Sequence, residues 1–340
     1  MAVYTQIGAE AMAALVAEYD IGELVSAKGI AEGVSNSNWL IETTGANGAK
    51  IGGTGARFIL TMYELRIEIA DLPYFLSLLD HLATHDCPVP RTIHDRDGRL
   101  FRLRPDKVGG GKAIALIEFL PGVSVSEPTP GQARAVGEAL ARMHLAVADF
   151  PGERANAMGV AEWQRLAAAC GPDGLRSIDP LLAELVAREL PVLAAQWPDD
   201  LPRSVIHADL FPDNVLMLGN RVTGLIDFYF ACNDLTAYDV AVTHAAWCFA
   251  DEGRQFRADL SAALLEGYES LRPLSTRERT ALPLLARGAA MRFALSRAFD
   301  WLNTPPGALV TRKDPMVPAR QLRFYADPEN SPIFARDAFA

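Results

Sequence analysis

The sequence contains little cysteine, and its few cysteines follow no motif. Only four occur in 340 residues, and no two have the C-x-x-C spacing of redox or zinc sites. They are Cys87, Cys170, Cys232 and Cys248. This scatter argues against a disulfide framework and against a zinc site. It fits reduced core thiols in the cytoplasm, which is the location we expect.

Long apolar runs are also missing. No uninterrupted apolar stretch approaches the length of a membrane span, and residues 1–9 lack the cationic and apolar segments of a signal peptide. The formal net charge is −10 and no basic cluster stands out, which is atypical of nucleic-acid-binding proteins. We therefore expect neither a membrane nor a nucleic acid as partner, and the oligomeric state is unknown at this point.

Several catalytic signatures are absent as well. The chain has no G-x-S-x-G, H-E-x-x-H or G-x-G-x-x-G string, which disfavours hydrolase, metalloprotease and dehydrogenase functions. The segment 109–112, Gly-Gly-Gly-Lys, resembles a phosphate loop. The G-x-x-x-x-G-K-[ST] pattern would need Gly at position 106 and Ser or Thr at 113, where the chain has Asp106 and Ala113. We interpret this segment as a loop between two strands.

What the sequence does contain is the pattern of a phosphotransferase catalytic loop. His207, Asp209 and Asn214 have the offsets of H-x-D-x-x-x-x-N, and Asp227 begins an Asp-Phe-Tyr string where D-F-G would stand. Hydrophobic residues make up 50% of the chain, as in globular proteins. The alternative is that Asp209 is a capping residue beside an ordinary hairpin.

The residue types suit phosphoryl transfer. Catalysis of this reaction consists mostly of positioning and charge neutralisation. Asp209 would accept or orient the proton of the attacking hydroxyl. Asn214 and Asp227 would supply the hard oxygen ligands that Mg²⁺ prefers. Residues 204–206 are predicted to form a buried strand before the loop, and 215–226 a hairpin that ends near Asp227.

The rest of the chain predicts two parts joined by a hinge. In the first part we expect a helix over 9–19, strands over 39–43 and 57–63, a helix over 72–85, and strands near 100–103 and 113–118. The connector 45–55 is rich in glycine and long for a hairpin.

A break at 118–122, Glu-Phe-Leu-Pro-Gly, precedes a mainly helical part. The helices are expected over 132–148, 160–169, 180–196, 237–250, 256–270 and 276–303, followed by a tail rich in proline. The predicted fold class is α+β, with residues 1–118 as an antiparallel sheet lobe, 119–122 as a hinge and 123–340 as a larger helical lobe.

Some polar residues have more than one interpretation. The turn-like segment 33–38 contains Ser35, Asn36, Ser37 and Asn38, whose backbone and side chains could bind phosphates. His144 and His207 are interpreted as structural histidines. Asp239 could cap a helix or brace the catalytic loop, and the sequence does not decide between the two.

Taken together, these motifs resemble the aminoglycoside phosphotransferase and choline kinase family of small-molecule kinases. The resemblance is closer to one branch, the homoserine kinases of bacterial threonine biosynthesis. The matching phrases are 31–34, 59–64, 205–214, 225–234 and 300–309. The last two, Leu-Ile-Asp-Phe-Tyr-Phe-Ala-Cys-Asn-Asp and Asp-Trp-Leu-Asn-Thr-Pro-Pro-Gly-Ala-Leu, are the most specific to that branch.

This resemblance implies a two-lobed, protein-kinase-like fold, ATP with Mg²⁺, and transfer to the side-chain hydroxyl of L-homoserine. It implies Asp209 as catalytic base and Asn214 and Asp227 as metal ligands. It also implies that the backbone of Glu118, Phe119 and Leu120 reads adenine. One departure concerns the phosphates, because Thr61 stands where kinases carry a strand lysine, and the cation that binds them is left open.

Charge complementarity predicts which residues form the acceptor pocket. Homoserine carries a carboxylate, best matched by a guanidinium, and an ammonium. The candidates are Arg292 or Arg297 for the carboxylate and Asp300 or Asp234 for the ammonium. Arg292 and Arg297 are about 140° apart around a helix, so we expect one of them to face the site. Other possibilities are a kinase of choline, methylthioribose or an aminoglycoside, and an inactive nucleotide-binding scaffold.

Overall fold

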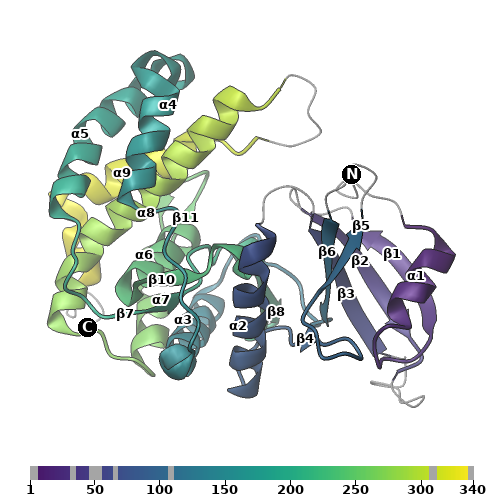
Figure 1. The fold of residues 1–340 in the computed structure, drawn as a ribbon. Coiled ribbons are helices and arrows are strands. Elements are labelled where there is room, and N and C mark those ends of the chain that lie inside the picture. The colour runs from purple at the N-terminus through teal and green to yellow at the C-terminus, as the bar shows by residue number, and fades with distance from the viewer. Residues whose placement is uncertain are drawn as a thin grey trace. The chain divides into compact units, whose positions relative to one another are not determined.

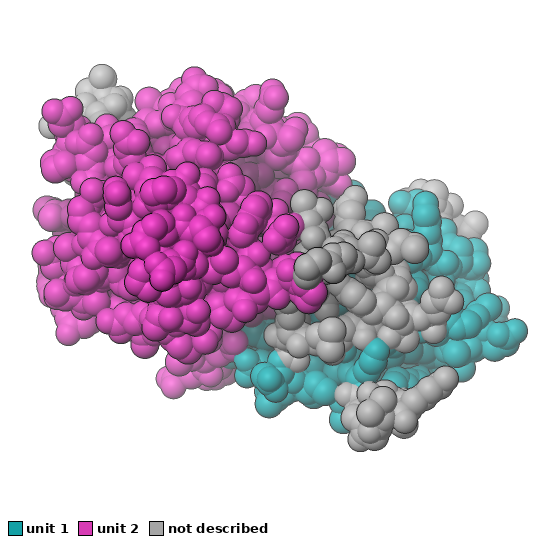
Figure 2. Space-filling view, turned by 90° about the horizontal axis from the view of Figure 1, so that it is seen from above, with its two compact units in different colours: residues 1–121 teal, residues 122–340 magenta. Residues whose placement is uncertain are grey.

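The computed structural model describes residues 7–30, 36–45, 56–63, 68–105, 111–305 and 312–335. The chain divides into two compact units, Met1–Pro121 and Gly122–Ala340, which Figure 2 colours separately. The division falls inside the segment 119–122 where the sequence predicts a hinge. The predicted connector 45–55 lies outside the described residues except for Gly45.

The first unit is built on an antiparallel sheet. Its strands are β1 (Leu24–Ile30), β2 (Asn36–Thr43), β3 (Ala56–Tyr63), β4 (Thr92–Ile93), β5 (Arg102–Pro105) and β6 (Gly111–Glu118). They follow the order β1-β2-β3-β6-β4, and β5 also pairs with β6 (Figure 1). The helices are α1 (Ala9–Val16) and α2 (Leu72–Thr84).

Side-chain alternation explains the core of this unit. On β2, Trp39, Ile41 and Thr43 are buried, whereas the residues between them are partly exposed, as expected for one face of a sheet. Trp39 and Ile41 pack with buried side chains of α1, β3 and β6. β2 begins at Asn36, so the expectation of a turn over residues 36–38 is wrong, because these residues pair with β3 from Asn36↔Tyr63 onward.

The second unit is mainly helical. Its helices are α3 (Pro130–Ala146), α4 (Val160–Ile178), α5 (Pro180–Gln196), α6 (Thr236–Trp247), α7 (Ala258–Glu269), α8 (Thr276–Asn303) and α9 (Met316–Ala326). Its short strands are β7 (Arg203–Ile206), β8 (Val215–Leu218), β9 (Arg221–Leu225), β10 (Cys232–Leu235), β11 (Phe249–Ala250) and β12 (Gln255–Phe256).

Local signals set several helix boundaries. Thr129 and Gln132 form a capping box at the start of α3, and Ser275 and Glu278 form another at the start of α8. α4 contains a kink at Gly171, whose φ is 65°. The sequence predicts a helix end near this position, and the structure instead has a second helical stretch after the kink.

Helix α3 packs against α7 at very short range. A Cβ atom on Gly137 would lie 2.1 Å from the carbonyl oxygen of Leu264, and one on Gly267 would lie 2.1 Å from that of Arg134. No side chain fits at these distances without moving the backbone, so the two glycines permit the close contact. Helix α8 packs against α6 and α9 and thereby crosses the middle of this unit.

Candidate active site

Strand β7 leads directly into the predicted catalytic loop. Val205 and Ile206 are buried and pair with β10 through Ile206↔Cys232. After the loop, β8 and β9 form an antiparallel hairpin. The amide of Ile226 donates to the carbonyl oxygen of Asn214 over 3.0 Å. The hairpin therefore returns the chain so that Asp227 follows a residue bonded to Asn214.

Asp209 and Asn214 are in direct contact. The Nδ2 atom of Asn214 donates to the backbone oxygen of Asp209 over 2.8 Å and to its Oδ2 over 3.2 Å. These bonds occupy the nitrogen end of the Asn214 amide and leave its Oδ1 available as a ligand atom. The carboxylate of Asp227 has no hydrogen-bond partner in the described part of the chain. The structure thus brings together the three residues that the sequence predicts as catalytic base and metal ligands.

The environment of both carboxylates disfavours their charged forms. Loss of water raises the pKa of Asp209 to about 7, an effect opposed by the charge of Arg292 and reinforced by that of Asp227. The same cause raises the pKa of Asp227 to about 6, and the charge of Lys313 opposes it. Carboxyl groups whose pKa is shifted in this way are common at functional sites.

The loop backbone is strained and held from α6. Ala208 has a φ of 63°, which residues other than glycine rarely adopt. Asp239 accepts hydrogen bonds from the amides of His207 and Ala208, both over 2.7 Å. The Nη1 atom of Arg292 donates to the carbonyl oxygen of Ala208. Of the two roles that the sequence left open for Asp239, the contacts are those of a brace for the catalytic loop.

Two histidines complete this scaffold, as the sequence predicts. His144 contacts the Oδ2 atom of Asp239 through Nε2 over 3.0 Å and the hydroxyl of Tyr268 over 2.8 Å. Burial alone would raise the pKa of Asp239, but the bonds from His144 and the loop hold it below its usual range. The Nε2 atom of His207 lies 3.0 Å from the carbonyl oxygen of Ile226, and burial lowers the pKa of His207. His207 is therefore a neutral structural donor.

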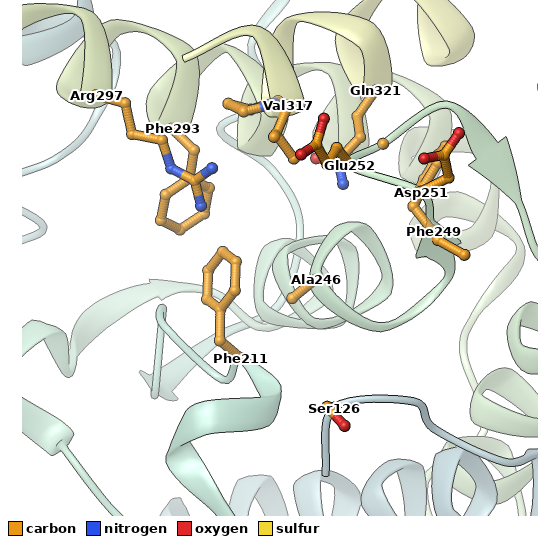
Figure 3. A pocket seen from close by; sticks show the side chains of 13 residues that line it. Ser126, Phe211, Ala246, Phe249, Asp251, Glu252, Phe293, Arg297, Val317 and Gln321 are labelled. Carbon is orange, nitrogen blue, oxygen red and sulfur yellow. The ribbon is translucent and has the colours of Figure 1, made fainter. Parts of the chain in front are cut away.

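The two candidate arginines of α8 lie in different surroundings. Arg292 is 1% exposed, and its guanidinium carbon is 4.7 Å from the centre of the Phe293 ring. Arg297 lines a cavity of about 260 Å³ within the second unit. In Figure 3 its guanidinium points into this cavity, toward Phe211. The expectation that one of the pair faces a pocket thus describes Arg297.

The candidate aspartates do not line that cavity. Asp234 is largely buried and accepts hydrogen bonds from the side chain of Asn156 over 2.7 Å and the amide of Leu235 over 2.8 Å. Asp300 is exposed near the end of α8. Neither is among the residues around the cavity, whose acidic members are Asp251 and Glu252.

The nucleotide candidates belong to the first unit. Asn36, Ser37 and Asn38 lie on β2, and the Oδ1 atom of Asn38 accepts from Thr61 over 2.8 Å. Ser35 lies outside the described residues. In the predicted hinge, the amide of Glu118 donates to the carbonyl oxygen of Arg91 over 2.9 Å. The amide of Phe119 donates to the carbonyl oxygen of Arg57 over 3.3 Å. The amide of Leu120 has no partner within the described ranges, so it can still donate to a ligand.

Lys313 is a basic residue that the sequence reasoning missed. Its Nζ atom lies 5.9 Å from the centre of the Phe211 ring in the catalytic loop, and its charge lowers the pKa of both Asp209 and Asp227. The only signal for it was a pair of basic residues, Arg312 and Lys313, a few positions after the specific phrase 300–309.

Comparison with known proteins agrees with this geometry. A family model described as the phosphotransferase enzyme family matches residues 26–274. The chain therefore belongs to this family of phosphotransferases. A curated protein of Azorhizobium caulinodans named homoserine kinase is 49% identical over 96% of this chain and 96% of its own length. One of Gluconacetobacter diazotrophicus with the same name is 49% identical over 97% and 98%. The resemblance drawn from the motifs is confirmed.

Solved structures share the fold. An amicoumacin kinase in complex with AMP-PNP, Ca²⁺ and Ami has a TM-score of 0.68 at 15% identity, over 94% of this chain and 93% of that one. A choline kinase from Cryptosporidium parvum has a TM-score of 0.60 at 14% identity, over 91% and 90%. The predicted α+β, kinase-like fold class is confirmed. Among the described residues, no helix is both long and apolar enough to cross a bilayer.

Proposed function

We propose that the chain transfers the γ-phosphoryl group of ATP to the side-chain hydroxyl of L-homoserine, which yields O-phospho-L-homoserine and ADP. The observation that carries the proposal is the convergence of Asp209, Asn214 and Asp227 on one loop and hairpin. The near-full-length relatives named homoserine kinase support the choice of acceptor.

Asp209 acts as the base in this proposal. The acceptor hydroxyl oxygen forms a bond to the γ-phosphorus while the bond between that phosphorus and the bridging oxygen breaks. The hydroxyl proton passes to the carboxylate of Asp209, and ADP leaves with the electron pair of the broken bond. A base whose pKa is about 7 is well matched to a proton transfer near neutral pH.

Asn214 and Asp227 fit the ligand set of a divalent cation. An amide oxygen oriented by the bonds of Nδ2 and a carboxylate without a hydrogen-bond partner in the described chain are hard donors, which favours Mg²⁺. When bound with ATP, this ion would neutralise the charge of the phosphate oxygens. The residues themselves hold the ligand oxygens near Asp209.

We assign nucleotide binding to the first unit, at the positions that the resemblance implies. Leu120 offers an amide that has no partner among the described residues, beside Glu118 and Phe119, for the adenine edge. Asn36, Ser37 and Asn38 at the start of β2 remain candidates for phosphate contacts, as does Ser35 from its place in the sequence. All four cysteines are buried and none forms a disulfide, which fits a reducing compartment, and the cytoplasm is the location we propose.

An ATP-consumption assay against a panel of alcohols tests the proposal. The panel contains L-homoserine, L-serine, choline, methylthioribose and an aminoglycoside, each with Mg²⁺. Homoserine should give the highest kcat/KM, and its product should be identified by mass and phosphorus NMR. Preferred turnover of another acceptor would assign a different kinase activity, and turnover of none would favour an inactive scaffold.

A further inference from the structure

The cavity beside the catalytic loop carries opposite charges on opposite walls. Figure 3 shows Arg297 and Phe293 on one side, with Phe211 rising from the loop toward them, and Phe249, Asp251 and Glu252 on the other side. A volume of about 260 Å³ suits a small metabolite. An acidic wall facing a basic one predicts a ligand that carries both charges.

Arg297 has unused hydrogen-bonding capacity. Its Nη1 atom donates to the carbonyl oxygen of Asp314 over 3.3 Å, and its side chain makes no other hydrogen bond within the described ranges. Its guanidinium carbon lies 6.0 Å from the centre of the Phe211 ring. Since a guanidinium has five N–H donors in a planar fork, most of them remain available to a carboxylate.

The acidic wall is a turn with an unusual backbone. Three successive residues between β11 and β12 have positive φ, namely Asp251 at 45°, Glu252 at 51° and Gly253 at 81°. Such conformations persist only where the surroundings enforce them. The Nη1 atom of Arg320 donates to the carbonyl oxygen of Glu252 over 2.9 Å. At Gly253 a Cβ atom would lie 2.6 Å from the carbonyl oxygen of Val317.

The two carboxylates of this turn keep acceptor sites for a ligand. The Nη1 atom of Arg254 lies 2.8 Å from Glu252 Oε2 and 3.4 Å from Asp251 Oδ1. Because a carboxylate has two oxygens and about four lone-pair positions, a single arginine cannot saturate both groups. The turn therefore presents a fixed acidic edge beside the cavity.

We propose that this cavity binds an α-amino acid in its zwitterionic form, with the carboxylate at Arg297 and the ammonium at Asp251 and Glu252. The inference rests on the proposed function and names the groups by which the acceptor is recognised. The ammonium site differs from the candidates Asp234 and Asp300, which lie away from the cavity. An acceptor that lacks one of the two charges would leave the protein group that pairs with this charge without a partner. Sites of this kind reject such analogues strongly.

The test compares acceptors that lack one charge at a time. L-homoserine is measured beside γ-hydroxybutyrate, which lacks the ammonium, and homoserinol, which lacks the carboxylate. The variants are D251N/E252Q and R297Q. The amides preserve the shape of the carboxylates, and asparagine tolerates positive φ. D259N is the matched control, since Asp259 is also an exposed carboxylate paired with an arginine, Arg257, but does not line the cavity.

Each variant should lose its discrimination against the acceptor that lacks the charge bound by the altered residues. In D251N/E252Q, the preference for homoserine over γ-hydroxybutyrate in kcat/KM should fall by about 10-fold or more, the range for a charged hydrogen bond. In R297Q the preference over homoserinol should fall similarly. The KM for ATP should stay at its wild-type value, and D259N should discriminate as the wild type does.

The outcomes separate this inference from the proposed function. If the wild type phosphorylates homoserine and both preferences survive in the variants, the pocket assignment is wrong while the activity stands. If the wild type instead phosphorylates L-serine or L-threonine and the variants lose the corresponding preferences, the activity is wrong while the zwitterion site stands. A wild type that prefers uncharged alcohols or choline would overturn both. The thermal unfolding of each variant shows whether it is folded. The single variant E252Q repeats the test without a change at Asp251.

Discussion

The carboxylate of Asp239 accepts a hydrogen bond from the amide of Ala208, 31 residues earlier in the chain, over 2.7 Å. Its other oxygen accepts from the amide of His207. Ala208 is the left-handed residue of the catalytic loop, and Asp209 follows it directly. A side chain on α6 thus sets the direction in which the proposed base leaves the loop.

Replacing Asp239 tests this relationship. In Asp239→Asn an NH₂ group replaces one carboxylate oxygen. This group would face the N–H of a loop residue, so two buried donors would stand where there is now a hydrogen bond. We expect a loss of about 3 kcal/mol in the free energy of unfolding and a fall in kcat of about 10-fold or more from misplacement of Asp209. Thr243→Val is the control, because Thr243 is buried on the same helix and its hydroxyl donates to the backbone oxygen of Asp239, not to its carboxylate. It should lose stability and keep kcat, and equal kcat losses would contradict the brace.

Asp209→Asn tests the proposed base. The amide cannot take a proton, so kcat should fall by roughly 10²–10⁴-fold, the usual range for a positioned acid–base group. Binding of ATP, measured by calorimetry, should change little because the residue faces the acceptor. Asp213→Asn changes an exposed aspartate of the same loop and serves as control. A variant with near-wild-type kcat would remove Asp209 from this role.

The metal ligands are tested by Asn214→Ala and Asp227→Asn. Asparagine is chosen at 227 because the φ of Asp227 is 66°, a region that asparagine tolerates better than alanine. Each change removes or weakens an oxygen ligand of a hard cation. The Mg²⁺ concentration for half-maximal activity should rise by about 10-fold or more, since one charged contact is worth roughly 1.5–3 kcal/mol. Unchanged Mg²⁺ titrations for both variants would refute the assignment.

Lys313→Met tests which cation faces the phosphates. The lysine lies over the Phe211 ring, and its charge lowers the pKa of Asp209 and Asp227. We therefore expect it to contact the phosphoryl group during transfer. Methionine keeps the length and removes the charge. The kcat should drop by about 10-fold or more while thermal stability changes little for this exposed residue. The neighbouring Arg312→Met, whose guanidinium lies over the Trp301 ring, should have a smaller effect, and the reverse order would exclude Lys313.

His244 predicts how stability responds to acid. It is buried between Tyr325 and Ser261, and burial lowers its pKa to about 3, below the value of about 6.5 for an unfolded histidine. The unfolded chain therefore takes up the proton first as the pH falls. The stability from neutral His244 is complete above about pH 6.5 and declines toward pH 3, by about 1.4 kcal/mol for each pH unit.

His244→Gln removes this dependence. Between pH 7 and pH 5 the wild type should lose about 2 kcal/mol more than the variant in the free energy of unfolding, measured by urea denaturation. The variant itself will be less stable at pH 7 because two buried hydrogen bonds change. The comparison therefore uses the difference between the two pH values, and an equal decline in both proteins would contradict the linkage.

The catalytic loop could be predicted from sequence because its information is local. Asp209 and Asn214 are five residues apart, and the apolar runs before and after them are short strands, as expected. The role of Asp239 could not be decided in the same way. A position in the first turn of α6 suits a cap as well as a brace, and only the contact with Ala208 distinguishes them.

The errors of prediction also have physical causes. No helix is predicted from the sequence in the proline-rich tail after Asn303, yet α9 forms there. Pro315 precedes the helix and Pro318 lies in its first turn, where proline costs no intrahelical bond. A helix was expected to continue to residue 250, whereas β11 and the left-handed turn follow α6. Arg297, Asp251 and Glu252 line the same cavity because of tertiary packing, which the spacing of residues along the chain does not encode.

The contact of Gly137 with α7 and of Gly267 with α3 limits how this protein can vary. Substitution of either glycine by alanine would force the backbones of α3 and α7 apart at a contact that includes neither Asp209 nor a residue of the cavity. Such variants should be recovered in low amounts while each folded molecule works at its normal rate. In a random library selected for growth, these two positions would therefore behave as essential although neither touches a substrate.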